Sequence, residues 1–410
     1  MRICAGADAR WWSAPSVEKP IRDTAARSHS PVRADATQNC EIGRFSRMGS
    51  VLATCDEHMR TQLSLCALLA ASLIGCATDS NMEEGDDTAP PWYEGVSTLT
   101  GASQAGNVDG PRGTARLNNP VNVAYGPDGK LYVADFDNDL LRVVDVETGD
   151  TSTVIKQANF KRPFGLAFGK DGTLYVSTDN DATGDGHSLM SGTIWRVNPA
   201  AKTATMVVEK IGRPRGLTVL TDGRIAIGDY MHHVVQVLNP STLELTVLAG
   251  TWDAKGMADA TGADARFSTP YHLVQRADGK LLVADYDNHR LRIVGLDGVV
   301  TTFTGGGAGF ADGAMTDAKF NHPQGMAQAA NGDIYVSDLG NYRIRKIVGN
   351  AVETVVGNGT GGFEDSDDKL SAEIYGLEGI SLKPDGSRLY LADGGRGELV
   401  PYNRIRVVSN

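Results

Sequence analysis

Cysteine is missing from most of this chain: all five cysteines (Cys4, Cys40, Cys55, Cys66 and Cys76) lie within the first 76 of its 410 residues. The remaining sequence therefore has neither disulfide bonds nor thiol chemistry. Aromatic residues are also scarce at 7%, whereas glycine is abundant with 48 residues. This composition is typical of an all-β protein with many turns, and internal repeats must be sought before the length is divided into domains.

No long hydrophobic run is found near the N-terminus, but a short one is. Residues 59–76 read MRTQLSLCALLAASLIGC, which is too short to span a bilayer and has the organisation of a secretory signal. Its end, Leu73-Ile74-Gly75-Cys76, resembles the lipobox of bacterial lipoproteins, in which the cysteine is acylated and becomes the new N-terminus. The resemblance implies lipidation of Cys76 and a protein held at the bacterial cell envelope, facing the periplasm or the cell surface. A signal peptide cut elsewhere, or a buried strand, is the alternative.

The segments on either side of this signal show no periodic pattern. Residues 1–58 are rich in Arg and Ser, which favours a disordered segment or a true translation start at Met59 or Met48. Residues 77–95, ATDSNMEEGDDTAPPWYEG, are acidic and contain proline, as expected of a solvated tether. Basic residues number 39 against 50 acidic ones, a formal net charge of −11. Nucleic acid and anionic lipid surfaces are therefore poor partners, and cationic ligands fit better.

From residue 96 onward the chain repeats one unit six times. Asp-Gly and Asn-Gly pairs readily adopt the positive φ angles of tight hairpins, and six of them punctuate this region. They are Asp128-Gly129, Asp171-Gly172, Asp222-Gly223, Asp278-Gly279, Asn331-Gly332 and Asp385-Gly386. The strand-like segments that follow are LYVAD at 131, LYVST at 174, IAIGD at 225, LLVAD at 281, IYVSD at 334 and LYLAD at 389. Their spacing of about 45 to 55 residues predicts four-stranded blades, and hence a six-bladed β-propeller over residues 96–410.

The two ends of the repeat region complement each other. The segment VSTLTG at 96–101 matches the fourth strand of later repeats, such as LTVLAG at 245–250. The C-terminal RIRVVSN ends directly after a third strand. The N-terminal segment is therefore predicted to complete the last blade and to close the ring, which leaves no exposed sheet edge.

One unit reads Asp285-Tyr286-Asp287-Asn288-His289-Arg290-Leu291-Arg292, and the next reads Asp338-Leu339-Gly340-Asn341-Tyr342-Arg343-Ile344-Arg345. These segments resemble the NHL family of repeats over residues 96–410. The resemblance implies a β-propeller that most often has a binding role, and it does not by itself imply a reaction.

Alternation within this unit also predicts how its third strand is buried. Leu291 and Ile293 alternate with Arg290 and Arg292, as in a strand with one buried face. His289 has Asp139, His233 and Tyr342 at equivalent positions, so no fixed side chain is expected there.

Long connections between blades and two insertions are predicted to share one face of the propeller. The connections at 101–119, 250–269, 305–322 and 357–376 carry a recurring Asp, then Ala and an apolar residue, as in Asp259…Ala265-Arg266-Phe267. We expect a capped turn whose Ala and Phe fill the seam between blades. Insertions follow the second strands of blades two and six, at 179–192 and 394–402. A loop-rich face on a rigid scaffold is where function usually lies.

The insertion DNDATGDGHSLMSG raises the question of a Ca²⁺ site. Asp179, Asp181 and Asp185 alternate with a glycine at the bend, as at the start of an EF-hand loop. Met190 stands where the bidentate glutamate would be, and no helices flank the loop. The alternative is a solvated loop without a metal.

A carboxylate ends the second strand of nearly every unit. The residues are Asp135, Asp229, Asp285, Asp338 and Asp393, with Asp179 shifted by one. Such a ring could hold a cation or a substrate. A residue that recurs in every blade is better explained by a structural role within the blade. We therefore interpret these aspartates as acceptors of backbone N–H bonds at the strand end.

Departures from the repeat are more informative about function. After the proline that begins each inner strand, the second residue is glycine in most blades, but it is Asn122 in blade one and His272 in blade four. These blades stand opposite each other, so the two side chains could meet across the channel, where a His can ligate a metal or move protons. The neighbouring candidates for ligand binding at this channel are Phe164, Arg215, Tyr271, Gln324 and Glu378.

Two classes of function are consistent with these features. The first is a lipid-anchored, monomeric binding module that takes a protein, a glycan or a small molecule on its loop-rich face, with no cofactor other than possible Ca²⁺. The second is a metal-dependent enzyme with a site in the central channel, as in the gluconolactonase-like hydrolases and the amidating lyase, whose six-bladed propellers have similar repeats. The lyase places His directly after the inner-strand proline, whereas this chain has Tyr271 and Gln324 there. No serine or cysteine nucleophile motif is present, and we favour binding.

Overall fold

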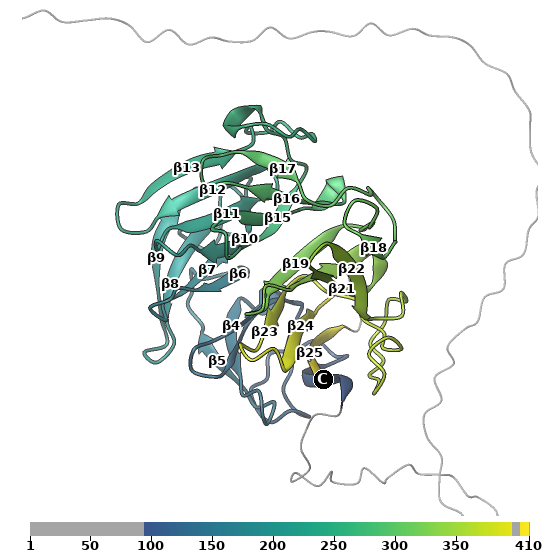
Figure 1. Cartoon of the computed structure of the whole chain (residues 1–410). Coiled ribbons are helices and arrows are strands. Elements are labelled where there is room, and N and C mark those ends of the chain that lie inside the picture. The colour runs from purple at the N-terminus through teal and green to yellow at the C-terminus, as the bar shows by residue number, and fades with distance from the viewer. Residues whose placement is uncertain (1–93, 396–401, 410) are drawn as a thin grey trace, which may run out of the picture. The chain divides into compact units, whose positions relative to one another are not determined.

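The computed structural model describes residues 94–395 and 402–409, which form six antiparallel sheets around a central axis (Figure 1). The predicted six-bladed β-propeller is confirmed. The inner strand of each sheet lies nearest the axis, where it contacts the inner strands of both neighbouring sheets. The sheets are numbered as blades one to six in chain order.

In blades one to five, four consecutive strands form a meander that runs from the axis outwards, and blade six has three such strands. Blade one contains β2 (Pro120–Tyr125), β3 (Leu131–Asp135), β4 (Leu140–Val144) and β5 (Thr151–Ile155). Blade two contains β6 (Pro163–Phe168), β7 (Leu174–Thr178), β8 (Thr193–Asn198) and β9 (Thr203–Glu209). Blade three contains β10 (Pro214–Val219), β11 (Ile225–Asp229), β12 (Val234–Asn239) and β13 (Glu244–Ala249).

The second half of the ring follows the same order. Blade four contains β14 (Pro270–Gln275), β15 (Leu281–Asp285), β16 (Arg290–Val294) and β17 (Val300–Thr302). Blade five contains β19 (Pro323–Gln328), β20 (Ile334–Asp338), β21 (Arg343–Val348) and β22 (Ala351–Val356), and the short β18 (Gly313–Ala314) adds a fifth strand beside β22. Blade six contains β23 (Ile380–Leu382), β24 (Arg388–Asp393), β25 (Asn403–Ser409) and β1 (Gly95–Ala102).

The ring is closed by the first strand of the propeller. β1 pairs antiparallel with β25, and Val96 lies opposite Val408. Leu99 is fully buried in this seam. The predicted closure by the N-terminal strand is therefore confirmed, and both ends of the propeller are held in one sheet.

A tight turn joins the first two strands of every blade. The six turn glycines have φ angles between 74° and 91°, a region that other residues rarely adopt. The preceding Asp or Asn stabilises the turn with its side chain; for example, Asp171 Oδ1 accepts the N–H of Thr173 at 3.0 Å. The predicted hairpins are present at all six positions.

Short 3₁₀ helices follow the second strand in blades one, four and five: η2 (Phe136–Asn138), η4 (Tyr286–Asn288) and η5 (Leu339–Asn341). A further one, η3 (Gly262–Asp264), lies in the connection before blade four. Over residues 94–395 and 402–409, no helix has the length and apolar character needed to cross a membrane.

The residue four positions after the strand-end aspartate has the same backbone conformation in blades one, three, four and five. Asp139, His233, His289 and Tyr342 all have φ between 51° and 59°. His289 Nδ1 accepts the N–H of His322 in the next blade at 3.1 Å, and Asp139 Oδ1 accepts that of Arg162 at 3.0 Å. The side chain varies at this position, as expected, whereas the backbone is left-handed in all four residues.

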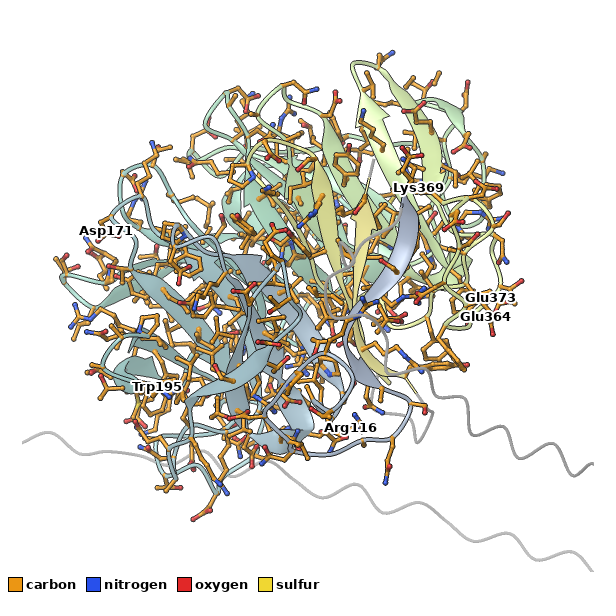
Figure 2. The ribbon with its side chains drawn as sticks, turned by 90° about the horizontal axis from the view of Figure 1, so that it is seen from below. Arg116, Asp171, Trp195, Glu364, Lys369 and Glu373 are labelled. Carbon is orange, nitrogen blue, oxygen red and sulfur yellow. The ribbon has the colours of Figure 1, made fainter. Side chains whose placement is uncertain are left out.

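Apolar side chains fill the seams between blades. Ala265 and Phe267 pack between blades three and four, and Ala318 and Phe320 pack between blades four and five, as expected for the long connections. Blade two has a bulkier core, in which the rings of Phe160 and Trp195 meet edge to face at 5.6 Å (Trp195 is labelled in Figure 2).

Four blades have a fully buried arginine on their third strand: Arg142, Arg292, Arg345 and Arg406. Arg292 donates to Asp285 at 2.8 Å and to Asp259 in the preceding connection at 2.6 Å. A polar outer face at Arg292 was expected from the alternation, and this expectation is wrong. The guanidinium points inward because two carboxylates and two backbone carbonyls there accept hydrogen bonds from its Nη1 and Nη2 groups.

Candidate functional site

The strand-end aspartates point into their own blades. Asp135, Asp285, Asp338 and Asp393 are fully buried, and each binds the third-strand arginine of its blade. Their other oxygen accepts backbone N–H groups, as in the bond from Ser268 N to Asp285 at 2.7 Å. These four carboxylates are thus fully engaged within the blade and do not converge on the axis.

Blades two and three depart from this arrangement. Within the described residues no arginine side chain binds Asp229; instead His232 Nδ1 lies 2.7 Å from its carboxylate and Gln236 donates at 3.3 Å. Asp179 binds two arginines of blade three: Arg213 through Nε and Nη2 at 2.9 and 2.8 Å, and Arg215 through Nη1 at 2.8 Å. Two guanidinium groups therefore share one buried carboxylate.

Contacts within this ion-pair triad shift the pKa of Asp179 and of Arg215. Burial would raise the pKa of Asp179, but Arg215 and then Arg213 outweigh it, so the pKa of this carboxyl lies below its usual value. Burial likewise opposes the charge of Arg215, but Asp179 raises its pKa further above the usual range. The triad joins two guanidinium groups to one carboxylate and therefore carries a net positive charge.

Aromatic rings from non-adjacent blades meet at the axis. Phe164 on β6 and Tyr271 on β14 belong to blades two and four, yet their ring centroids lie 5.8 Å apart. Tyr271 also packs against Tyr230 at 5.7 Å and Tyr286 at 5.4 Å. Tyr271 therefore occupies the axis itself at this end of the channel. We call this end the channel mouth, and it consists of Phe164, Arg215, Tyr271, Gln324, Glu378, Tyr230 and Tyr286.

Charged groups from two opposite blades act on the pKa of Tyr271. Burial raises the pKa of Tyr271 well above its ordinary value, and the next largest cause is the carboxylate of Glu378 in blade six. Arg215 of blade three acts in the opposite direction. The mouth thus has cationic groups on the side of blade three and a carboxylate on the side of blade six.

Arginine stacks on both outer rings of this group. The Arg215 guanidinium lies 4.3 Å from the ring centroid of Phe164 and 4.3 Å from that of Tyr230. Arg162, directly before the inner-strand proline of blade two, lies 4.5 Å from the centroid of Phe136. Arg162, Arg213, Tyr230 and Phe136 were not predicted as site residues, although a charged residue beside the inner-strand proline was visible in the sequence.

His272 and Asn122 lie close to the axis but have different neighbours. The Asn122 side chain packs against Gly379 and its oxygen accepts the N–H of Val123 at 2.8 Å. His272 instead lines the channel below the mouth, a cavity of about 380 Å³ bounded by all six inner strands. Within the described residues its Nδ1 is buried without a hydrogen-bond partner, and burial lowers the pKa of His272 to about 4. A neutral imidazole therefore lines a channel whose other lining residues include Thr218, Gln328 and Ser381.

Glycine lines the ring at the level of His272. A Cβ on Gly216 would lie 2.6 Å from the Cα of His272, and one on Gly165 would lie 2.3 Å from the carbonyl oxygen of Arg215. The inner strands approach so closely at this level that a side chain has no room. Gln324, on the same strand as Gly325, is 1% exposed, and its Oε1 is buried with no partner in the part of the chain that the structure describes.

The predicted Ca²⁺ loop does not bring its three aspartates together. Asp179 faces Arg213 and Arg215, whereas Asp181 accepts the N–H groups of Thr183, Gly184 and Gly186 within its own turn. These bonds, led by the hydroxyl of Thr183, lower the pKa of Asp181. Across residues 94–395 and 402–409, no group of three or more His, Cys, Asp or Glu side chains is placed to hold a metal ion.

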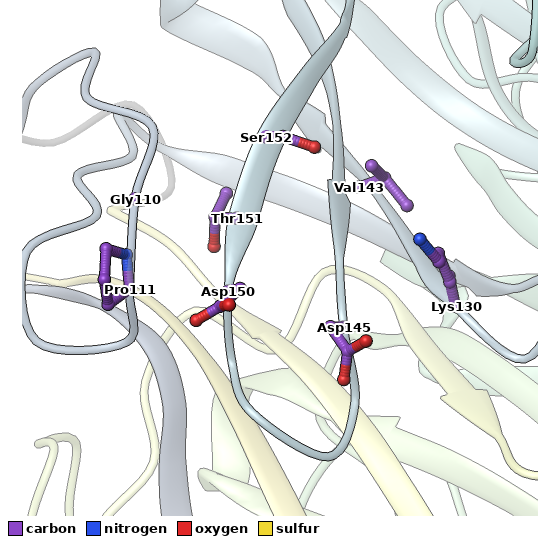
Figure 3. A pocket seen from close by; sticks show the side chains of 8 residues that line it. All are labelled: Gly110, Pro111, Lys130, Val143, Asp145, Asp150, Thr151 and Ser152. Atoms are coloured by element: carbon purple, nitrogen blue, oxygen red, sulfur yellow. The ribbon is translucent and has the colours of Figure 1, made fainter. Parts of the chain in front are cut away.

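Other hollows lie at the outer edge of the propeller. One, of about 380 Å³, is lined by Asp145, Asp150 and Lys130 beside the hairpin of β4 and β5 (Figure 3). A neighbouring groove of about 470 Å³ runs between blades one and two. Their lining residues belong to the regular part of the repeat. The channel mouth is the site at which the chain departs from its own pattern.

Comparison with known proteins places this fold among known propellers. The NHL repeat model matches residues 320–347, which cover most of β19 to β21. Protein SUPPRESSOR OF QUENCHING 1 of Arabidopsis thaliana is 28% identical over 185 residues, and NHL repeat-containing protein 2 of Bos taurus is 32% identical over 138 residues. These alignments cover 45% and 31% of this chain, and 14% and 19% of those relatives. The chain is a six-bladed β-propeller in which one segment matches the NHL repeat, and it matches less than a fifth of the length of these relatives.

A solved structure shows the same fold over most of the chain. An auxiliary nutrient binding protein of Bacteroides thetaiotaomicron superposes with a TM-score of 0.60, covering 76% of this chain and 75% of that one. The sequence identity is 18%, so this likeness concerns the fold.

The lipidation candidate Cys76 lies outside the described residues, as do the signal segment 59–76 and nearly all of the tether. The same holds for residues 396–401 of the second insertion.

Proposed function

We propose that this chain is a cell-envelope binding protein that takes a small-molecule ligand at the channel mouth. The observation that carries the proposal is the meeting of Phe164 and Tyr271 at the axis, with Arg215 and Glu378 on opposite sides. Elsewhere the blades repeat their side chains, so this group is not needed to build a blade. Aromatic side chains flanked by a few charged groups are the usual composition of a ligand site.

Two further observations support this role. The mouth lies on the face that carries the 3₁₀ turns and the insertion at 179–192, where loops can shape a ligand site. In addition, one protein with this fold is described as an auxiliary nutrient binding protein. We further propose that Cys76 is lipidated and that residues 77–95 tether the propeller to the membrane.

A ligand screen tests the binding role. The purified protein is heated with sugars, organic acids, amino acids and short peptides, and a ligand that occupies the mouth raises the melting temperature. Tyr271→Ala should abolish the increase, whereas Tyr335→Ala, at the opposite end of a blade, should retain it. Absence of any shift across the screen, or equal shifts in Tyr271→Ala and the unaltered protein, contradicts the proposal.

A further inference from the structure

Beside the channel mouth lies a cation, Arg162, that no acidic side chain of the described residues pairs with. Arg162 is half-buried, and within residues 94–395 and 402–409 its guanidinium makes no ion pair. Over the same residues its Nε is buried without a hydrogen-bond partner. A partly desolvated guanidinium without a counter-charge is costly, and its planar fork matches a carboxylate.

The backbone position of Arg162 is set by the fold, whereas the side chain there varies among the blades; blade three also has an arginine, Arg213, directly before its inner-strand proline, but Arg213 is paired with Asp179. Asn119, Thr269 and His322 occupy equivalent positions with φ angles of 52°, 62° and 54°, and Arg162 has 52°. Asp139 holds the backbone N–H of Arg162 at 3.0 Å. The backbone at this position therefore belongs to the blade, and the blade itself gives no reason for an arginine side chain.

Arg162 belongs to a larger cationic corner. Phe136 and Phe164 pack edge to face at 5.8 Å, with Arg162 over the first ring and Arg215 over the second. Arg215 and Arg213 share the single carboxylate of Asp179, so one positive charge of that triad is also uncompensated. The carboxylate of Asp139 reduces this excess but forms no ion pair with Arg162. The corner is therefore positive in a protein whose net charge is −11.

The opposite side of the mouth has the opposite character. Glu378 in blade six acts on Tyr271 from across the axis. Between the two sides lie the partly exposed rings of Tyr230, Tyr271 and Tyr286. A ligand that lies on these rings meets positive charge towards blades two and three and negative charge towards blade six.

We propose that the ligand is a small organic acid whose carboxylate binds Arg162 and whose planar or apolar part lies on the tyrosine rings. This rests on the proposed function and names its ligand class. Glu378 fixes the orientation, because it repels the carboxylate from blade six. The tyrosine faces supply the apolar contact, which free inorganic anions cannot use.

Three probes separate the alternatives by calorimetry on the purified protein: benzoate, its neutral analogue benzamide, and inorganic phosphate. Benzoate should bind more tightly than benzamide, and its affinity should fall as salt is added. Arg162→Gln should weaken benzoate binding by about tenfold or more, because one charge-assisted bond is lost. The affinity for benzamide should not change in this variant.

Arg224→Gln is the matched control, since Arg224 pairs with Asp222 in a turn at the far end of blade three. This variant should bind benzoate like the unaltered protein. Arg162→Lys, which keeps the charge but loses the planar fork, should lie between the two. Equal unfolding curves for Arg162→Gln and the unaltered protein establish that the variant is folded; if the curves differ, the comparison is made with Arg162→Lys.

The inference is overturned if Arg162→Gln, or a Lys variant standing in for it, binds benzoate as tightly as the unaltered protein. It is also overturned if benzamide binds as tightly as benzoate, if no probe binds, or if phosphate alone binds. The proposed function is tested independently of this ligand class. Neutral ligands that bind the unaltered protein but not Tyr271→Ala would retain the mouth as a site while removing its preference for acids.

Discussion

Arg292 Nη1 lies 2.8 Å from Asp285 Oδ2, and both side chains are fully buried. The same guanidinium reaches Asp259, which in turn accepts the N–H of Thr302 on the outer strand β17 at 3.0 Å. One arginine thus connects the end of the second strand, the preceding connection and the outermost strand of blade four. This arrangement recurs with small changes in blades one, five and six.

Replacing Asp285 by Asn should therefore be severely destabilising. The change leaves the buried guanidinium of Arg292 with Asp259 as its remaining carboxylate, and removing one partner of a buried pair costs about 3 to 5 kcal/mol in the free energy of unfolding. Asp287→Asn is the matched control, because Asp287 is exposed two residues away. Urea denaturation measures both variants. Equal stability of the two would refute a structural role for the buried pair.

His272 should make stability depend on pH. Its pKa is about 4 in the folded protein, against an ordinary value of 6.5. Between these values the unfolded chain takes up a proton that the folded protein does not, so stability is lost as the pH falls. The full effect is about 3 kcal/mol between neutral pH and pH 4.

His272→Asn isolates this effect, because blade one already has asparagine at the equivalent position. Urea denaturation of both proteins at neutral pH and near pH 4.5 cancels the contribution of the carboxylates. The unaltered protein should lose more stability on acidification than the variant. Parallel losses would show that His272 is not buried in its neutral form.

Alanine at Gly216 should destabilise the centre of the propeller. Its Cβ would lie 2.6 Å from the Cα of His272, and backbone atoms of two inner strands would have to move apart. Overpacking of this kind costs about 1 to 3 kcal/mol. Gly113→Ala serves as the control, since a Cβ there has no neighbour within 4 Å among the described residues. A thermal melt that does not distinguish the two variants would argue against close inner-strand contact.

Cys76→Ser tests the membrane anchor. If Cys76 carries acyl chains, the variant should move from the membrane fraction to the soluble fraction on cell fractionation, since the acyl chains provide the attachment. Mass spectrometry of the unaltered protein should show the lipid mass on a chain that begins at Cys76. A variant that stays in the membrane fraction would refute lipidation at this residue.

The sequence was sufficient to predict the fold because repetition multiplies weak local signals. The six Asp-Gly or Asn-Gly turns and the six strand segments set the blade boundaries, and the match of residues 96–101 to later fourth strands predicted ring closure. The burial of individual side chains was harder to predict from a single unit. In blade four, Arg292 alternates with apolar residues as a surface residue would, although it is fully buried.

The recurrence of this arginine would have revealed its role. It lies seven residues after the strand-end aspartate in blades one, four and five, as in Asp135 and Arg142. A charge that returns at constant spacing from an opposite charge indicates a pair. At the turn that ends in His289, side chains vary although the backbone is fixed, so comparison of residue types concealed the constraint.

The channel mouth was predictable only in part. Phe164, Arg215, Tyr271, Gln324 and Glu378 were located from their place after the inner-strand start. Arg162 and Asp179 were not assigned to the mouth, because their roles depend on side chains that come from different blades. The contact between Phe164 and Tyr271 crosses the axis, and no local pattern encodes it.

The pairing of β1 with β25 also determines when the propeller can be completed. β1 is the first strand of the propeller to be synthesised and β25 is the last, so the ring stays open until both are available. Closing a contact of such high sequence separation is slow, and the edge of β1 is exposed to other strands in the meantime. The final step of folding therefore awaits β25, and loss of this strand would leave β1 without a partner.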